Sequence, residues 1–142
     1  MRRTAGSCLP ALCAGLLAGC IASNVVATED RAVLRPVAEL PFVAAPELVL
    51  DGLYESIEIT GDAALALRRI YYLFRPDGTY TAAALTEGER GAAFQTLSGT
   101  WTNTAAGLSL DGADPVRLER ADEHLRITAA NGAVVLRRSA AP

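Results

Sequence analysis

The 142-residue sequence predicts an all-β domain, in which about eight short strands form an antiparallel meander and a small up-and-down β-barrel. Three observations support this fold class. Short apolar runs recur at regular spacing from residue 48 onward, turn-forming residues separate them, and only residues 63–69 are rich in good helix formers. Sequential strands joined by tight turns can close into a barrel, which removes exposed strand edges.

The first four predicted strands flank one strong turn signal. Residues 53–59 form the first strand and residues 67–75 the second, which is rich in β-branched and aromatic side chains. The tripeptide Pro76-Asp77-Gly78 predicts a hairpin, because proline presets φ and glycine accepts the positive φ of a tight turn. Residues 79–85 form the returning strand, and residues 93–102 form the fourth.

The last four predicted strands are short and alternate between apolar and polar residues. They cover residues 108–110, 116–119, 125–127 and 134–136. Leu118, for example, points to one face while Glu119 points to the other. The dipeptide Asn131-Gly132 predicts the hairpin before the final strand. We therefore expect the apolar faces to fill the barrel and the charged faces to point outward.

Residues 1–19 have the layout of a secretory signal peptide. Two arginines near the start precede residues 4–19, which carry no charge. The segment ends in Leu17-Ala18-Gly19-Cys20, which resembles the lipobox of bacterial lipoproteins: an aliphatic residue, two small residues and a cysteine. The resemblance implies a diacylglyceryl group on the sulfur of Cys20, cleavage between Gly19 and Cys20, and acylation of the new N-terminus.

A transmembrane anchor is the alternative for this segment. The uncharged run from residue 4 to residue 28 is nominally long enough to span a bilayer. Pro10 and several glycine and polar residues interrupt it, which favours the lipoprotein. Ile21, rather than an aspartate, follows the cysteine, and in Gram-negative lipoproteins this favours the outer membrane, facing the periplasm.

Residues 20–46 form the predicted lipidated N-terminus and tether, and residues 47–142 form the barrel domain. Pro36, Pro41 and Pro46 are evenly spaced, which prevents a continuous helix. One interpretation is a stalk that holds the domain away from the membrane. The other is an ordered arm in which Leu40, Phe42 and Val43 pack on the domain. We expect a loose first half and a docked second half.

Three motifs resemble bacterial lipocalin-like lipoprotein domains, including the META type. They are the run Phe74-Arg75-Pro76-Asp77-Gly78-Thr79-Tyr80, the tripeptide Gly99-Thr100-Trp101 and the tripeptide Leu108-Ser109-Leu110, within residues 48–138. The resemblance implies a lipocalin-like barrel. The C-x-x-C motif of the copper-associated members is absent, and Gly99-Thr100-Trp101 lies near the fourth strand rather than the first. Thiolate metal handling and lipocalin ligand transport are therefore not implied.

Trp101 is the only tryptophan, and it is the main candidate for a pocket or a core. On one strand it shares a face with Leu97 and Gly99. Gly99 leaves room for the indole to cross the sheet or to plug one end of the barrel. Core filling and a ligand pocket both remain open, with core filling favoured.

The sequence lacks the residue sets of catalytic and metal sites. All three cysteines lie in the first twenty residues, which excludes a disulfide scaffold, a zinc ribbon and a cysteine nucleophile in the body of the protein. His124 is the only histidine, and Asp111 and Asp114 are interpreted as turn formers rather than calcium ligands. We therefore expect no enzyme activity, no catalytic residues, no metal and no cofactor besides the lipid on Cys20.

A net charge of −3, with aromatic residues at only 6%, argues against nucleic-acid binding, which would need a basic face. The expected function is that of a lipid-anchored cell-envelope lipoprotein whose barrel binds an envelope protein or a small apolar ligand. The alternative is a periplasmic inhibitor of a hydrolase such as lysozyme. Such inhibitors usually carry a disulfide, and its absence here makes this alternative the weaker one.

Overall fold

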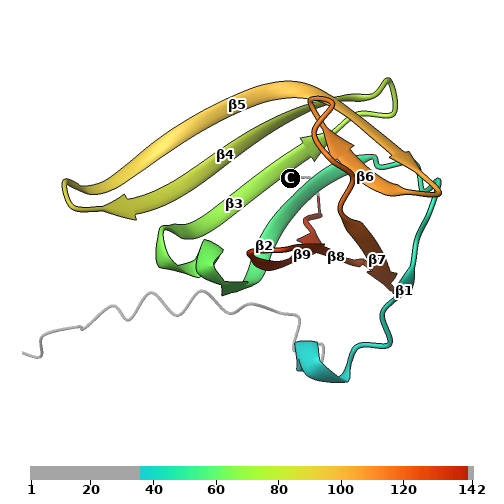
Figure 1. Cartoon of the computed structure of the whole chain (residues 1–142), viewed down its shortest axis with the longest axis horizontal. Helices are drawn as coiled ribbons and strands as arrows, with labels where there is room; N and C mark the ends of the chain where they lie inside the picture. The colour runs from blue at the N-terminus through green and yellow to red at the C-terminus, as the bar shows by residue number, and fades with distance from the viewer. Residues whose placement is uncertain (1–35, 141–142) are drawn as a thin grey trace, which may run out of the picture. The chain divides into compact units, whose positions relative to one another are not determined.

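The computed structural model describes residues 36–140, which form one curled sheet of nine antiparallel strands. The order of the strands in the sheet is β1-β7-β8-β9-β2-β3-β4-β5-β6 (Figure 1). The strands are β1 (Val43–Ala44), β2 (Gly52–Gly61), β3 (Leu67–Phe74), β4 (Thr79–Gly88), β5 (Gly91–Thr104), β6 (Gly107–Leu110), β7 (Arg117–Ala121), β8 (His124–Ala129) and β9 (Gly132–Arg138). The predicted all-β meander is confirmed.

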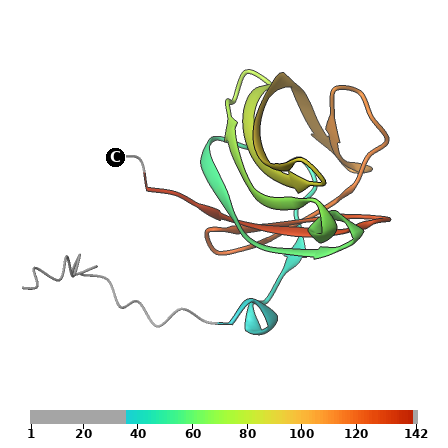
Figure 2. The ribbon, with the colours of Figure 1, turned by 90° about the vertical axis from the view of Figure 1, so that its left-hand side faces the viewer.

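The sheet curls, so that strands far apart in the sequence become neighbours (Figure 2). β9 pairs with β2 along most of its length. β6 is the last strand in the sheet order. There a single antiparallel bridge joins Leu108 to Val116, with backbone N···O distances of 2.9 and 2.8 Å. Because β6 has only 4 residues and β5 has 14, the bridge closes one end of the barrel only.

All eight strands predicted from the sequence are present, as β2 to β9. The turn Pro76-Asp77-Gly78 joins β3 to β4, and Gly78 has the positive φ of 84° that the turn requires. The next hairpin is longer than predicted. β4 extends to Gly88 and β5 begins at Gly91, which leaves only Glu89 and Arg90 as the loop between them.

Helix is confined to two short 3-10 turns in the part of the chain that the structure describes. η1 (Val37–Glu39) precedes β1, and η2 (Asp62–Leu65) joins β2 to β3. η2 overlaps the start of the stretch 63–69 that is rich in helix formers, and the end of that stretch belongs to β3. Among residues 36–140, no helix is long and apolar enough to cross a membrane.

An aromatic cluster fills the interior around Phe74, which is 1% exposed. Its ring stacks on Tyr72 at a centroid distance of 5.2 Å and meets Tyr54 and Trp101 edge to face at 6.0 and 6.1 Å. Such edge-to-face and offset pairs are the favoured aromatic geometries. Buried aliphatic side chains complete the core: Leu50, Ile70, Leu108, Leu118, Leu125 and Leu136.

The end of the predicted tether packs on the sheet. Leu40 is buried, and the guanidinium of Arg126 in β8 lies 4.3 Å from the ring centroid of Phe42. Val43 pairs with Arg120 of β7 through its backbone, while its side chain is exposed. We call residues 37–44 the N-terminal arm. The predicted signal peptide, Cys20 and the first part of the tether lie outside the described residues.

Candidate functional site

Gly99 lies at a corner where three strands are joined by one carboxylate. A Cβ on Gly99 would overlap the carboxylate of Asp111, which follows β6. That carboxylate accepts hydrogen bonds from the backbone N–H of Thr100 at 2.9 Å and the hydroxyl of Tyr80 in β4 at 2.7 Å. The backbone N–H of Asp111 donates to the carbonyl of Thr100 at 2.8 Å. Gly99 therefore makes room for the carboxylate of Asp111, a contact that the sequence did not predict.

The pKa values at this corner describe a structural contact. Burial raises the pKa of Tyr80 to about 12, and its hydrogen bond to Asp111 adds to the shift. The hydrogen bonds from Tyr80 and Thr100 hold the pKa of Asp111 below its usual range. Asp111 is thus an ionised acceptor and Tyr80 a neutral donor at neutral pH. Neither group is tuned to exchange protons near pH 7.

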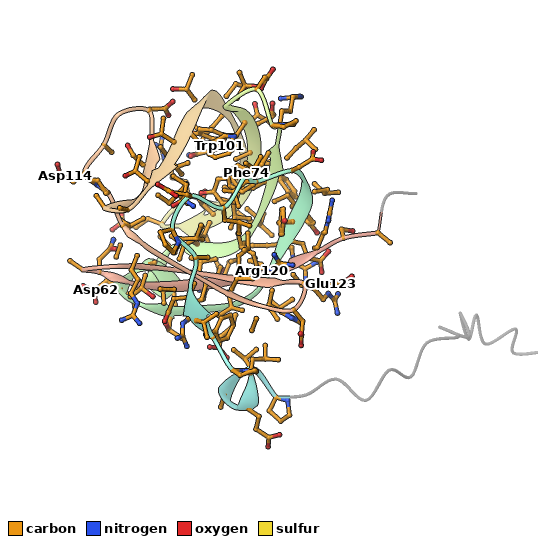
Figure 3. The ribbon with its side chains drawn as sticks, turned by 90° about the vertical axis from the view of Figure 1, so that its right-hand side faces the viewer. Asp62, Phe74, Trp101, Asp114, Arg120 and Glu123 are labelled. Atoms are coloured by element: carbon orange, nitrogen blue, oxygen red, sulfur yellow. The ribbon has the colours of Figure 1, made fainter. Side chains whose placement is uncertain are left out.

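Trp101 lies in the core beside Phe74 (Figure 3). Its indole N–H donates to the carbonyl of Arg75 at 3.0 Å, so the only polar atom of the ring is bonded. Leu97 is 50% exposed, although it shares a strand face with Trp101. The three residues named from the sequence therefore have three different locations. Trp101 lies in the core, Gly99 lies against the carboxylate of Asp111, and Leu97 lies on the exposed part of β5.

The N-terminal part of β5 is exposed on both faces. Every residue from 91 to 98 is exposed, including Phe94, whose exposed fraction is 73%. β4 covers one edge of this segment, from Gly91 to Thr100. On the other edge, β6 pairs only from Trp101 onward. Within the described residues, the segment therefore has one unpaired edge, which we call the β5 free edge (residues 91–98).

The hydrogen bonds at the end of this segment show which backbone groups face the free edge. The N–H of Trp101 donates to Gly78 on the β4 side, while the N–H and carbonyl of Thr100 bond to Asp111 on the other side. In an antiparallel strand the direction of these groups alternates with each residue. The N–H and carbonyl groups of the alternate residues therefore point away from β4 along the free edge: Ala92, Phe94, Thr96 and Ser98.

A second feature is a cavity of about 280 Å³ at the end of the barrel next to the β7–β8 turn. Arg120 and Arg138 line it together with Tyr54. Burial raises the pKa of Tyr54, and the two nearby guanidinium groups partly oppose that rise. Three carboxylates also line the cavity, namely Asp51, Asp122 and Glu123, and Figure 3 labels Arg120 and Glu123 there. The mixed charge favours neither anions nor cations.

The described residues hold no cluster of three or more side chains suited to a metal ion. His124 is half-buried, and its Nδ1 atom has no hydrogen-bond partner among residues 36–140. Asp114 is exposed, whereas Asp111 is engaged by Tyr80 and Thr100. Two pairs of adjacent arginines lie at strand ends, namely Arg68-Arg69 at the start of β3 and Arg137-Arg138 at the end of β9. Arg68 bonds to Glu87 at 2.6 Å, and Arg137 approaches Glu55 at 3.5 Å.

Comparisons with protein-family models, with curated proteins and with solved structures found no significant match. The resemblance to lipocalin-like lipoprotein domains therefore stays a prediction. Among the described residues, the β5 free edge combines an unpaired row of backbone groups with exposed apolar side chains. The strand was predicted from the sequence, whereas its free edge was not. One feature of the sequence could have indicated the free edge. No charged residue lies between Arg90 and Asp111, and the strand predicted at the end of this run is very short.

Proposed function

We propose that this chain is a lipid-anchored lipoprotein of the cell envelope whose barrel binds an envelope protein and has no catalytic role. The observation that carries the proposal is the β5 free edge, where a row of backbone donors and acceptors has no partner within the described residues. Another extended chain can pair with such an edge and add a strand to the sheet.

The composition of the edge supports binding by strand pairing. Natural proteins protect exposed edges with charged side chains, prolines, bulges or very short strands. Residues 91–98 contain no charge and no proline, and their register with β4 shows no bulge. Phe94 and Leu97 add exposed apolar surface to the two faces of the same segment. Because this edge has none of these protecting features, we expect a binding partner to cover it.

A protein partner is preferred to a small apolar ligand because of the interior packing. The rings around Phe74 lie at centroid distances of 5.2 to 6.3 Å, and the indole of Trp101 is one of them. An eight-stranded barrel has room for its own side chains or for one small ligand. Here aromatic side chains occupy the region around Trp101.

The anchor is tested through Cys20. Metabolic labelling with a fatty acid is expected to mark the wild-type chain, while Cys20→Ala accumulates as an unlabelled precursor. Fractionation of the labelled chain is expected to place it in the outer membrane. Absence of label on both proteins would contradict the lipoprotein and support a transmembrane anchor.

The binding surface is tested by photo-crosslinking in intact cells. A photoreactive phenylalanine analogue at Phe94 is expected to give one discrete adduct with an envelope protein. The matched control is the same analogue at Val43, which is 64% exposed in β1, at the far end of the strand order from β5. Equal labelling at both positions, or no adduct at Phe94, would contradict binding through the β5 free edge.

A further inference from the structure

We infer that the partner at the β5 free edge is the β5 free edge of a second copy of this chain, paired antiparallel about a two-fold axis at Gln95. The inference rests on the proposed function, because it names the partner that binds there. The pairing would join two curled sheets into one continuous sheet across the axis.

The register follows from the outward-facing backbone groups. Ala92, Phe94, Thr96 and Ser98 carry these groups, and Gln95 lies at the centre of the four. A two-fold axis at Gln95 sets Ala92 opposite Ser98 of the partner copy and Phe94 opposite Thr96 of the partner copy. Each such pair exchanges two backbone hydrogen bonds. Every outward N–H and carbonyl from residue 92 to residue 98 then has a partner, on both copies.

The side chains are compatible with the same register. On the inner face, Ala93 lies opposite Leu97 of the partner copy, so a small side chain meets a large one. On the outer face, Phe94 lies opposite Thr96, and aromatic and β-branched residues form favourable cross-strand pairs. Both exposed apolar residues of the segment, Phe94 and Leu97, gain a neighbour. Gln95 meets Gln95 of the partner copy, whose amide can both donate and accept.

The charge distribution supports a second copy as the partner. No charged residue lies between Arg90 and Asp111, so pairing brings no like charges together along the strand. Arg90 reaches the level of Thr100 of the partner copy, to which Asp111 is bonded. Asp114 belongs to the same turn, and Glu89 is exposed beside Arg90. The two-fold axis therefore repeats, at both ends of the paired segment, Arg90 and Glu89 beside a turn with two aspartates, of which Asp111 is already bonded to Tyr80 and Thr100.

The pairing is tested with single cysteines in the full-length chain after Cys8, Cys13 and Cys20 have been replaced by serine. Gln95 faces its own copy in a non-hydrogen-bonded pair, where Cα atoms lie about 4.5 Å apart. This spacing suits a disulfide. Gln95→Cys is therefore expected to convert most of the chain to a disulfide-linked dimer under mild oxidation.

Matched controls fix the register. Ala93→Cys alone places the two sulfurs about 13 Å apart, at four residues of strand rise, and is expected to crosslink at least tenfold less. A mixture of Ala93→Cys and Leu97→Cys chains is expected to form the heterodimer. Equal crosslinking of every single-cysteine variant, or crosslinking at another position but not at Gln95, would overturn the inferred pairing.

A proline at Thr96 gives a second, independent test. It removes an N–H that faces the free edge and spares the bonds to β4, so Thr96→Pro is expected to fold and to sediment as a monomer. Wild type is expected to sediment as a dimer. A monomeric wild type whose Gln95→Cys variant forms no disulfide overturns the inference. The proposed function survives that result if the photo-adduct at Phe94 contains a different envelope protein, and it fails if there is no adduct.

Discussion

The carboxylate of Asp111 connects three strands at the closed end of the barrel. It follows β6, accepts the backbone N–H of Thr100 in β5 and accepts the hydroxyl of Tyr80 in β4. The absence of a side chain at Gly99 is what permits this approach. The tripeptide Gly99-Thr100-Trp101 thus has two structural roles, one at the corner and one in the core.

Gly99→Ala is expected to lower the melting temperature by several degrees, because the new Cβ displaces the carboxylate of Asp111. Gly88→Ala is the matched control, since a Cβ there meets nothing within 4 Å. In an Asp111→Ala background the Gly99→Ala change is expected to cost almost nothing more. Thermal melts of the four chains measure this coupling, and additive effects of the two changes would contradict the role given to Gly99.

Trp101→Ala is expected to lower the free energy of unfolding by roughly 3–5 kcal/mol, because a large buried side chain is lost. Phe94→Ala is the matched control: its ring is exposed, and its removal from the monomer is expected to change stability by less than about 0.5 kcal/mol. Denaturant unfolding measures both values. Blue-shifted tryptophan emission that moves red on unfolding is expected from the same experiment. Solvent-exposed emission in the folded chain would contradict the packing of Trp101.

At the scale of elements, the N-terminal arm affects how far side chains on the outer face of β7 and β8 are buried. Glu119 alternates outward in the sequence pattern, yet it is only 3% exposed. It accepts bonds from Arg126 at 2.6 Å and Arg117 at 2.7 Å, and Arg126 in turn lies over Phe42 of the arm. Alternation predicts the direction of a side chain, but it cannot show that a segment 75 or more residues away will cover it.

The same limit applies to β5. Its residues, its hairpin partner and the turns on either side were predictable from local turn chemistry and β-propensity. The free edge depends on how many residues of the next strand pair with it, and β6 stops after 4. Likewise, nothing local to Gly99 indicates that Asp111 will fill its missing side-chain volume. Contacts between distant parts of the chain decided both features.

Glu119→Gln is expected to lower the free energy of unfolding by roughly 1–3 kcal/mol at pH 7, because hydrogen bonds to a charged group are lost. The bonds from Arg126, and the charges of Arg126 and Arg117, hold the pKa of Glu119 below its usual range. Its contribution is therefore fully present above the unfolded pKa of about 4.3, and it is lost as pH falls through the lower folded value. Unfolding curves from pH 7 down to pH 3 measure the difference between the two chains. A difference that stays constant over this range would contradict the ion pairs.

At the scale of the whole molecule, the arm and the β5 free edge lie on opposite sides of the barrel. Figures 1 and 2 both place η1 and β5 far from each other, on either side of the interior. The chain therefore enters the barrel from the side away from the proposed binding edge.

The most direct test of the β5 free edge is amide hydrogen exchange of the wild-type chain, resolved by residue, at low and high protein concentration. The N–H groups of Gln95 and Leu97, which face β4, are expected to be protected at both concentrations. Those of Phe94 and Ser98 are expected to exchange rapidly in the dilute chain and to become protected at high concentration. Protection of Phe94 and Ser98 in the dilute monomer, equal to that of Gln95 and Leu97, would contradict a free edge.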